Sequence, residues 1–200
     1  MSRMQAPLSG GRFVSLDTET TGLSTWRDAV VSIAVVEIVD GHPAAAPLID
    51  ARVKPHRSIP ASATAIHGIA DADVVDAPPL SALWRQLMSL LDDAVVVGHS
   101  IGFDMAMLKR EARRAALPWR APPILDTRLL SAALEPPLAH LDLAAIAARF
   151  GVECGPRHTA LGDAITAARL FGRLVERLEA VGVHTVAAAS VFAERVHLPR

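Results

Sequence analysis

The 200-residue chain lacks several features, and each absence excludes a class of protein. Cys154 is its one cysteine, which rules out an internal disulfide and a thiolate metal cluster. No apolar run approaches the ~20 residues that a bilayer-spanning helix needs. The first residues, MSRMQAPLSGG, lack the apolar core of a signal peptide, so we expect an intracellular, cytoplasmic protein. Tyrosine is absent altogether.

Positive and negative charges nearly cancel, and the formal net charge is −1 at pH 7. The chain has no global basic signature, so any binding of nucleic acid must depend on a local surface or on metal ions. Hydrophobic residues make up 51% of the chain and charged residues 20%, which is typical of a globular protein and not of a disordered one. At this length we expect one domain with its own hydrophobic core.

Three apolar segments in the first third of the chain predict β-strands. Residues 12–16 form the first, and residues 29–39 form a nearly continuous run rich in Val and Ile that is expected to be covered on both faces. Residues 48–54 form a third strand of alternating character, after a turn at Asp40-Gly41. These three strands predict an antiparallel meander.

The rest of the chain alternates between strands and helices. Residues 80–91 place several leucines and Trp84 on one helical stripe. The other predicted elements are strands at 94–97 and 124–125, and helices at 103–116, 141–149, 160–180 and 184–197. This order predicts an α/β fold in layers, with antiparallel strands on one side of the sheet and crossover connections on the other.

The chain shows no internal repeat, low-complexity stretch or linker that would divide it. We therefore expect a loose, flexible N-terminal tail over residues 1–10 and a single domain over residues 11–180. Residues 181–200 are expected to form a C-terminal helix or tail packed on the same domain.

Acidic residues stand at the ends of predicted strands and at the starts of predicted helices. Asp17 and Glu19 are two residues apart on an extended segment, so their side chains point the same way. Asp104 follows a buried strand, and Asp163 lies in the first turn of the long helix, whose dipole favours its ionised form. Taken singly, each acid is explained by a cap or a solvated turn. Together they predict a shared site, because sites in open α/β sheets assemble at such ends.

Four stretches of sequence carry a resemblance to a known family. The first is SLDTETTGL, with Asp17 and Glu19, and the second is VVGHSIGFD, with Asp104. The third is HTALGDA, with His158 and Asp163, and AIHGI lies between the first two. A single D-x-E pattern is weak, but four segments in the right order are specific. The chain resembles the DEDDh, or DnaQ-like, family of 3′–5′ exonucleases, which includes the epsilon proofreading subunit of bacterial DNA polymerase III.

The resemblance implies a ribonuclease-H-like fold of three layers, with a mixed five-stranded sheet flanked by helices. It also implies two divalent metal ions held by the four acids of the motifs: Asp17, Glu19, Asp104 and Asp163. The residue types agree, because hard oxygen ligands without cysteine or a histidine cluster suit Mg²⁺ or Mn²⁺. Two ions ~3.5–4 Å apart can stabilise both the attacking and the leaving oxygen of a phosphodiester displacement.

The resemblance makes His158 the general base that takes a proton from the attacking water. A histidine side chain, with an ordinary pKa of about 6.5, suits that role near neutral pH. A sister branch of the superfamily uses a tyrosine at this place, and a chain without tyrosine is excluded from that branch.

Substrate contacts are carried over from the family to six residues: Thr18, Thr20, Leu23, His67, His99 and Phe103. Leu23 is expected to act as a wedge against the last base, and His67 to meet the 3′ end. The alternative for His67 is a histidine at a helix end that only caps or packs. Ser100 stands where the family often has asparagine, which removes any contact made by that amide. Asp126 is interpreted as a supporting acid that caps a helix starting at Thr127.

The motif set predicts a metal-dependent 3′–5′ exonuclease that releases nucleoside 5′-monophosphates. A decayed binding module would have lost an acid or His158, and none is lost. The near-neutral charge suits short 3′ ends held by metals and stacking, so we favour single-stranded or mispaired DNA, in proofreading or repair. Turnover of short RNA and an accessory polymerase-binding subunit are the alternatives. The stretch QLMSLL at 86–91 resembles a clamp-binding peptide, but its helical spacing favours a core helix. A polymerase or clamp partner and the oligomeric state stay open.

Overall fold

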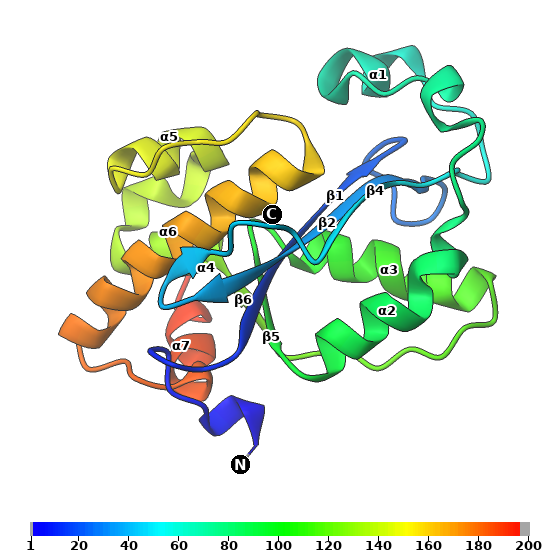
Figure 1. The fold of residues 1–200 in the computed structure, drawn as a ribbon. Coiled ribbons are helices and arrows are strands. Elements are labelled where there is room, and N and C mark those ends of the chain that lie inside the picture. The colour runs from blue at the N-terminus through cyan, green and yellow to red at the C-terminus, as the bar shows by residue number, and fades with distance from the viewer. Residues whose placement is uncertain (1, 197–200) are drawn as a thin grey trace.

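A computed structural model describes residues 2–196 of the chain, which form one mixed β-sheet with helices on both faces (Figure 1). Its longer strands, in chain order, are β1 (Phe13–Thr20), β2 (Val30–Val39), β4 (Ile49–Arg52), β5 (Val95–Gly98) and β6 (Ile124–Asp126). β2 pairs antiparallel with β1 on one side and with β4 on the other, which confirms the predicted meander. β5 lies parallel to β1, and β6 lies parallel to β5. The mixed α/β class of the prediction is therefore confirmed.

The sheet has six strands instead of the predicted five, because the turn after β2 adds a short partner. Asp40 and Gly41 both have positive φ, at 50° and 77°, as a tight type I′ hairpin turn requires. The chain folds back at this turn to form β3 (His42–Pro43) beside the end of β2. The additional strand lies far along β2 from the acids of β1, so it leaves the predicted site unchanged.

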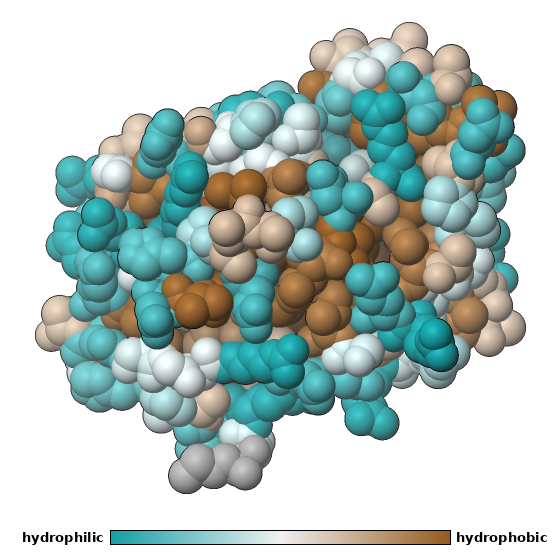
Figure 2. Space-filling view, viewed as in Figure 1, coloured by the Kyte–Doolittle hydropathy of each residue, from teal (hydrophilic) through white to brown (hydrophobic). Residues whose placement is uncertain are grey.

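Helices form a layer on each face of the sheet. The helices of one layer are α2 (Leu80–Asp92) and α3 (Gly102–Arg114), which share a core cluster with β1, β2 and β5. The helices of the other layer are α4 (Thr127–Leu134), α5 (Leu143–Arg149), α6 (Ala160–Ala180) and α7 (Val186–Ala193). Figure 2 shows a brown, hydrophobic tract over the middle of the side of the molecule seen in Figure 1. In Figure 1 the strands extend past the first turn of α6. The carboxyl end of β1 thus lies beyond the start of α6.

β1 is buried on both faces, and its residues alternate between the two layers. Leu16 points into the α2–α3 layer, whereas Phe13 packs against α6. The hydroxyl of Ser15 donates a 2.8 Å hydrogen bond to a backbone carbonyl in the first turns of α6. By the same alternation, Asp17 and Glu19 face the layer that begins with α6.

A short helix, α1 (Ala61–His67), lies near the carboxyl end of β1 and was not among the predicted elements. Ala63 of this helix packs in a small core cluster with Val31 of β2. Seven residues are too few to show helical periodicity, and no side chain caps its start. Tertiary packing, and not a local signal, therefore sets this helix.

The prediction of a loose tail over residues 1–10 is wrong for its described part, residues 2–10. Leu8 is 3% exposed and joins the core cluster that includes α7. Arg3 donates to two backbone carbonyls at and just after the end of α2, over 2.9 and 3.0 Å. Pro7 forms a bridge with Thr185. A few apolar side chains, Arg3 and backbone hydrogen bonds to the loop before α7 hold the segment, and contacts of this kind leave no periodic pattern in the sequence.

The C-terminal helix α7 packs against α4 and β6, on the same body as the rest of the described chain. The sequence predicted this helix over residues 184–197; residue 197, and with it the end of the predicted 181–200 segment, lies outside the described residues. Within residues 2–196, no helix combines the length and the apolar character needed to cross a membrane.

Candidate active site

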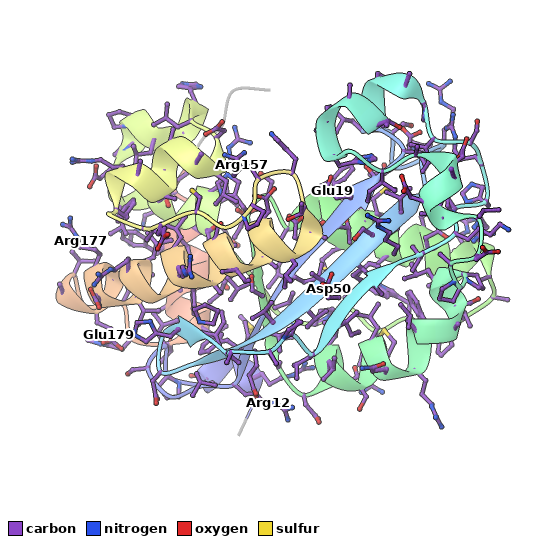
Figure 3. All side chains as sticks on the ribbon, turned by 45° about the horizontal axis from the view of Figure 1, so that its top comes forward. Arg12, Glu19, Asp50, Arg157, Arg177 and Glu179 are labelled. Carbon is purple, nitrogen blue, oxygen red and sulfur yellow. The ribbon has the colours of Figure 1, made fainter. Side chains whose placement is uncertain are left out.

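The parallel strands β1, β5 and β6 end at one edge of the sheet, and the acids of the motifs gather there. Asp17 and Glu19 lie near the end of β1, and Asp163 lies in the first turn of α6. One carboxylate oxygen from each of these three residues lies within 4.8 Å of the other two. We call Asp17, Glu19 and Asp163 the acidic cluster; Figure 3 shows Glu19 close to the start of α6. Three of the four predicted metal ligands are thus brought together.

Asp104 reaches the same edge from the opposite layer of helices. It lies in the first turn of α3, is 4% exposed, and accepts a 2.6 Å hydrogen bond from the Thr18 hydroxyl. Thr18 stands between the two acids of β1, so it faces α3 while they face α6. Burial raises the pKa of Asp17 well above its usual range, and repulsion from Asp104 adds to this. The fourth predicted ligand is therefore electrostatically part of the cluster, although it lies outside the 4.8 Å group.

Burial raises the pKa of all four acids of the motifs, and repulsion by the other acids adds to it at Asp17 and Glu19. Burial, and then the charges of Asp163 and Asp104, raise the pKa of Glu19 to about 7. Burial also raises the pKa of Asp104 to about 7, although the hydrogen bond from Thr18 opposes it. The pKa of Asp163 is raised as well, mainly by burial. Such carboxyl groups ordinarily ionise at about pH 4, so near neutral pH the metal-free site retains protons that a divalent cation would replace.

Arg157, which the sequence analysis did not select, offsets part of the negative charge. Its Nε lies 3.2 Å from Asp163 Oδ1, in an ion pair whose side chains are 28% and 13% exposed. Its charge lowers the pKa of Asp163 in opposition to burial. Figure 3 shows Arg157 on the loop that precedes α6. The signal available in the sequence was its place directly before His158, the first residue of the third motif.

His158 is held beside the acidic cluster by its backbone. Its N–H donates to Asp163 Oδ2 over 3.2 Å, and its φ of 56° lies in the left-handed region. A residue with a side chain costs about 1–2 kcal/mol in this conformation, so the surrounding contacts must fix it there. The residue is exposed, which leaves its imidazole accessible next to the acids.

The loop before α6 lies directly on the first turn of the helix. Thr159 caps the helix: its hydroxyl oxygen accepts from Gly162 N over 3.1 Å and donates to the Pro156 carbonyl over 2.8 Å. A Cβ on Gly162 would overlap the Pro156 carbonyl oxygen. Glycine thus allows the close approach that places Arg157 and His158 beside the cluster.

Two of the predicted substrate residues use their hydroxyl groups inside the protein. Thr18 donates to Asp104, and Thr20 donates to the carbonyl of Gly22 over 2.7 Å. Both threonines are 8% exposed. Neither has a hydroxyl hydrogen left for a ligand, so a contact from this segment would come from its backbone.

Both ring nitrogens of His67 are engaged at the end of α1. Nδ1 accepts from Ile69 N over 3.1 Å, which leaves Nε2 to donate to the Thr20 carbonyl at 3.2 Å. Burial lowers the pKa of His67, in keeping with a neutral ring. This is the capping and packing arrangement that we weighed as the alternative, and it ties α1 to the end of β1. Contact with a 3′ end stays a prediction.

The loop after β1 displays two large apolar side chains to solvent. Leu23, the predicted wedge, is 88% exposed, and Trp26, which the sequence analysis overlooked, is 81% exposed. Asp28 holds the loop in place: it accepts from Ser24 N at 2.8 Å and pairs with Arg57 at 2.8 Å. The loop therefore presents Leu23 and Trp26 from a fixed base, next to the strand that carries the acids.

His99 and Phe103 have different surroundings. Phe103 is partly buried against the core cluster of α2 and α3. His99 Nδ1 lies 3.1 Å from the Thr127 hydroxyl, and burial together with the charge of Arg128 lowers its pKa to about 4. His99 lines a pocket that also contains Asp17, whereas Phe103 is not among the residues of that pocket.

Asp126 supports the edge in the way the sequence predicted. It caps α4, and its Oδ1 accepts from Arg128 N at 2.9 Å and Leu129 N at 3.4 Å. It also accepts from Ser100 N at 3.0 Å, and Ser100 has a φ of 60°. The prediction of a cap is confirmed, and the same carboxylate fixes the unusual turn between β5 and α3.

The donor set suits a hard divalent cation. The cluster offers carboxylate oxygens alone, and apart from the ion pair with Arg157 the buried Asp163 Oδ1 has no hydrogen-bond partner among the described residues. Oxygen ligands of this kind bind Mg²⁺, Mn²⁺ or Ca²⁺ in preference to softer metals. The raised pKa of each acid shows that the site favours a gain of positive charge.

A mixed sheet with helices on both faces and acids gathered at one edge is the arrangement of the ribonuclease-H-like fold class. Residues 14–171 match the RNase_T family, described as exonuclease. The chain belongs to this exonuclease family. The resemblance to DnaQ-like exonucleases in the motifs is thereby confirmed.

Two curated relatives show how the chain compares with longer proteins. It is 40% identical, over 92% of its length, to a DNA polymerase III subunit epsilon-like protein of Rhodobacter capsulatus, of which it spans 26%. It is 29% identical, over 88% of its length, to DNA polymerase III PolC-type of Staphylococcus saprophyticus, of which it spans 12%. The chain thus corresponds to about a quarter or less of these relatives.

Solved structures share the fold. Exonuclease X in complex with 5′ overhanging duplex DNA matches with a TM-score of 0.68 and 26% identity, over 90% of this chain and 99% of that one. E. coli Exonuclease I in complex with a dT13 oligonucleotide matches with a TM-score of 0.71 and 17% identity, over 86% of this chain and 42% of that one. The second likeness supports the fold alone.

Proposed function

We propose that the protein is a metal-dependent 3′–5′ exonuclease that releases nucleoside 5′-monophosphates from the 3′ end of single-stranded or mispaired DNA. The observation that carries this proposal is the acidic cluster: three motif carboxylates within 4.8 Å, with Asp104 held beside them by Thr18. Two divalent cations, Mg²⁺ or Mn²⁺, would be held by the four acids. When bound, they would stabilise negative charge on the phosphodiester as it reacts.

His158 is the general base of the proposed reaction. It would accept a proton from the water that attacks phosphorus, while the bond from phosphorus to the 3′ oxygen of the preceding nucleotide breaks. The products are a nucleoside 5′-monophosphate and a strand that ends in a 3′ hydroxyl. The exposed imidazole and the backbone bond to Asp163 support this role, because they leave the ring free at a fixed place.

In this proposal the terminal nucleoside binds on the side of Leu23 and α1. Leu23 and Trp26 offer apolar surface for stacking, which contributes ~1–3 kcal/mol per base when a strand binds. DNA is favoured over RNA because Exonuclease X, 26% identical, was solved with DNA. The names of the curated relatives support a setting in replication or repair, with a polymerase or clamp as partner.

Matched 5′-labelled DNA and RNA oligonucleotides, single-stranded and with a mispaired 3′ end, test this function. With Mg²⁺ we expect a ladder of DNA fragments that keep the label and shorten from the 3′ end, and slower loss of RNA. Release of the label as a mononucleotide in the first turnovers would contradict the polarity. Faster cleavage of RNA than of DNA would instead favour turnover of short RNA.

A further inference from the structure

A second group of side chains adjoins the acidic cluster, in a pocket of about 420 Å³. Asp17 and Asp163 line this pocket together with four nitrogen-bearing side chains: His99, Arg128, His140 and Arg157. These four come from the end of β5, the first turn of α4, the 3₁₀ turn Pro136–His140 and the loop before α6. The motifs account for the acids, whereas Arg128 and Arg157 lie outside the motifs.

Arg128 is an unusual residue for its position. It lies in the first turn of α4, where the positive end of the helix dipole disfavours a cation by ~0.3–1 kcal/mol. One guanidinium nitrogen donates to the Ala139 carbonyl at 3.0 Å, which fixes the side chain. Its Nε is buried and finds no hydrogen-bond partner among the described residues. A cation fixed at the positive end of a helix favours a nearby anion, and Arg128 lines the pocket beside the acidic cluster.

The charges around the pocket change in favour of an anion once cations occupy the carboxylates. Asp142 caps α5 by accepting from Ala145 N at 2.9 Å, and Arg157 pairs with Asp163 at 3.2 Å. Divalent cations on the acidic cluster would neutralise Asp17 and Asp163. Arg157 would then no longer be needed to balance the charge of Asp163. Arg128 and Arg157 would then carry two positive charges against the one of Asp142.

We propose that Arg128 and Arg157 form a phosphate subsite for the part of the strand that precedes the scissile bond. This inference rests on the proposed exonuclease function. A strand extends from its 3′-terminal nucleotide in one direction only, toward its 5′ end. If the terminal nucleoside lies on the Leu23 side of the acids, the rest of the strand therefore leaves on the opposite side. That strand is a polyanion, and the two arginines match its phosphodiester oxygens. His99 and His140 complete the lining of the subsite.

Two substrates separate an upstream subsite from other roles. A single-stranded DNA oligonucleotide has upstream phosphates, whereas the p-nitrophenyl ester of thymidine 5′-monophosphate has the scissile phosphate alone. Arg128→Ala should lower kcat/KM on the oligonucleotide ~10–100-fold, as expected for the loss of a charged hydrogen bond. The loss on the ester should be at least about tenfold smaller. Equal losses on both substrates, or none on either, would overturn the subsite.

Equilibrium binding gives a second readout that needs no turnover. The affinity for a fluorescent oligonucleotide in Ca²⁺ should depend less steeply on salt in Arg128→Ala, with a slope about 0.7 to 1 smaller than in the wild type. Arg128→Lys, which keeps the charge, should retain most of the slope, and Arg157→Gln should reduce it like Arg128→Ala. An unchanged slope in both neutral variants refutes the proposal.

Arg177→Ala is the matched control, since Arg177 is exposed at the other end of α6 (Figure 3). It should match the wild type in the kinetic and binding assays. If wild-type protein cleaves neither substrate, the proposed function fails, while the salt slopes still decide whether the arginines bind phosphates. Binding of inorganic phosphate or thymidine 5′-monophosphate as tightly as the oligonucleotide would identify a product site and exclude an upstream one.

Discussion

The hydroxyl of Thr18 donates a 2.6 Å hydrogen bond to Asp104, across the sheet from the acids on either side of Thr18. This bond lowers the pKa of Asp104 against the effect of burial. It therefore connects the one ligand from the α3 layer to the strand that carries Asp17 and Glu19.

Thr18→Val should weaken metal binding while the fold is retained. Without the hydroxyl, the buried carboxyl group of Asp104 loses a partner worth about 1–3 kcal/mol and takes up a proton more readily. We expect a higher Mg²⁺ concentration for half-maximal nuclease activity, and Thr18→Ser should restore the wild-type value. A Mg²⁺ titration of Thr18→Val that coincides with the wild type would show that the bond has no such role.

The metal-free protein should lose stability as pH rises from 6.5 to 8. Glu19 and Asp104 have folded-state pKa values of about 7, well above the ~4 of an unfolded chain. The folded protein thus keeps protons that the unfolded chain has released, and it loses that advantage as pH rises through 7. The opposite contributions of His56, His67 and His99, whose pKa values are lowered (that of His99 to about 4), are largely made below the ordinary histidine pKa of about 6.5.

Thermal melts in EDTA measure this pH dependence. For a chain of this size, a change of about 1 kcal/mol in the free energy of unfolding shifts the melting temperature by about 2–4 °C. The wild type should melt lower at pH 8 than at pH 6.5, and Mg²⁺ should restore most of the difference. Glu19→Gln removes one repelling carboxylate, so it should melt higher than the wild type at pH 8 and vary less with pH. A flat wild-type profile, or a destabilised Glu19→Gln at pH 8, would contradict the electrostatic account.

His158→Ala should lower the turnover number by roughly 10²–10⁴-fold, the usual contribution of a general base. Single-turnover digestion of a DNA oligonucleotide measures the chemical step directly. His184, exposed in the loop before α7, provides the control, and His184→Ala should be indistinguishable from the wild type. A loss below about threefold in His158→Ala would remove this residue from the role.

Gly162→Ala should displace the loop that carries Arg157 and His158. The new methyl group would overlap the Pro156 carbonyl, and such overpacking costs about 1–3 kcal/mol. We expect a lower melting temperature and a loss of turnover of roughly 10²-fold, typical of a catalytic group moved by ~1 Å. Gly102→Ala is the matched control, because a Cβ there meets nothing within 4 Å. Wild-type activity in Gly162→Ala would show that the close approach is unimportant.

Local rules predicted the acidic cluster well. The alternation of β1 places Asp17 and Glu19 on one face, and the predicted helix at 160–180 has the observed bounds of α6, with Asp163 in its first turn. Periodicity within one segment was enough for both conclusions. The cap made by Asp126 was predictable for the same reason.

Contacts between distant segments were not predictable. The bond between Thr18 and Asp104 joins residues 86 positions apart, and α1 and the N-terminal segment are set by packing and hydrogen bonds to distant parts of the chain. Arg157 resembled any surface arginine in the sequence, since only the loop geometry before α6 brings it to Asp163. Residue type and spacing find the acids of the site, whereas the partners that tune them depend on the tertiary fold.

The most direct test of the central claim compares Mn²⁺ binding and DNA hydrolysis in the wild type and in Asp17→Ala. Calorimetric titration should find two Mn²⁺ ions per wild-type chain and the loss of at least one in the variant. Digestion of a 5′-labelled oligonucleotide should stop in Asp17→Ala and in wild type treated with EDTA, while circular dichroism shows both folded. Wild-type digestion rates in Asp17→Ala, or cleavage that persists in EDTA, would contradict the account.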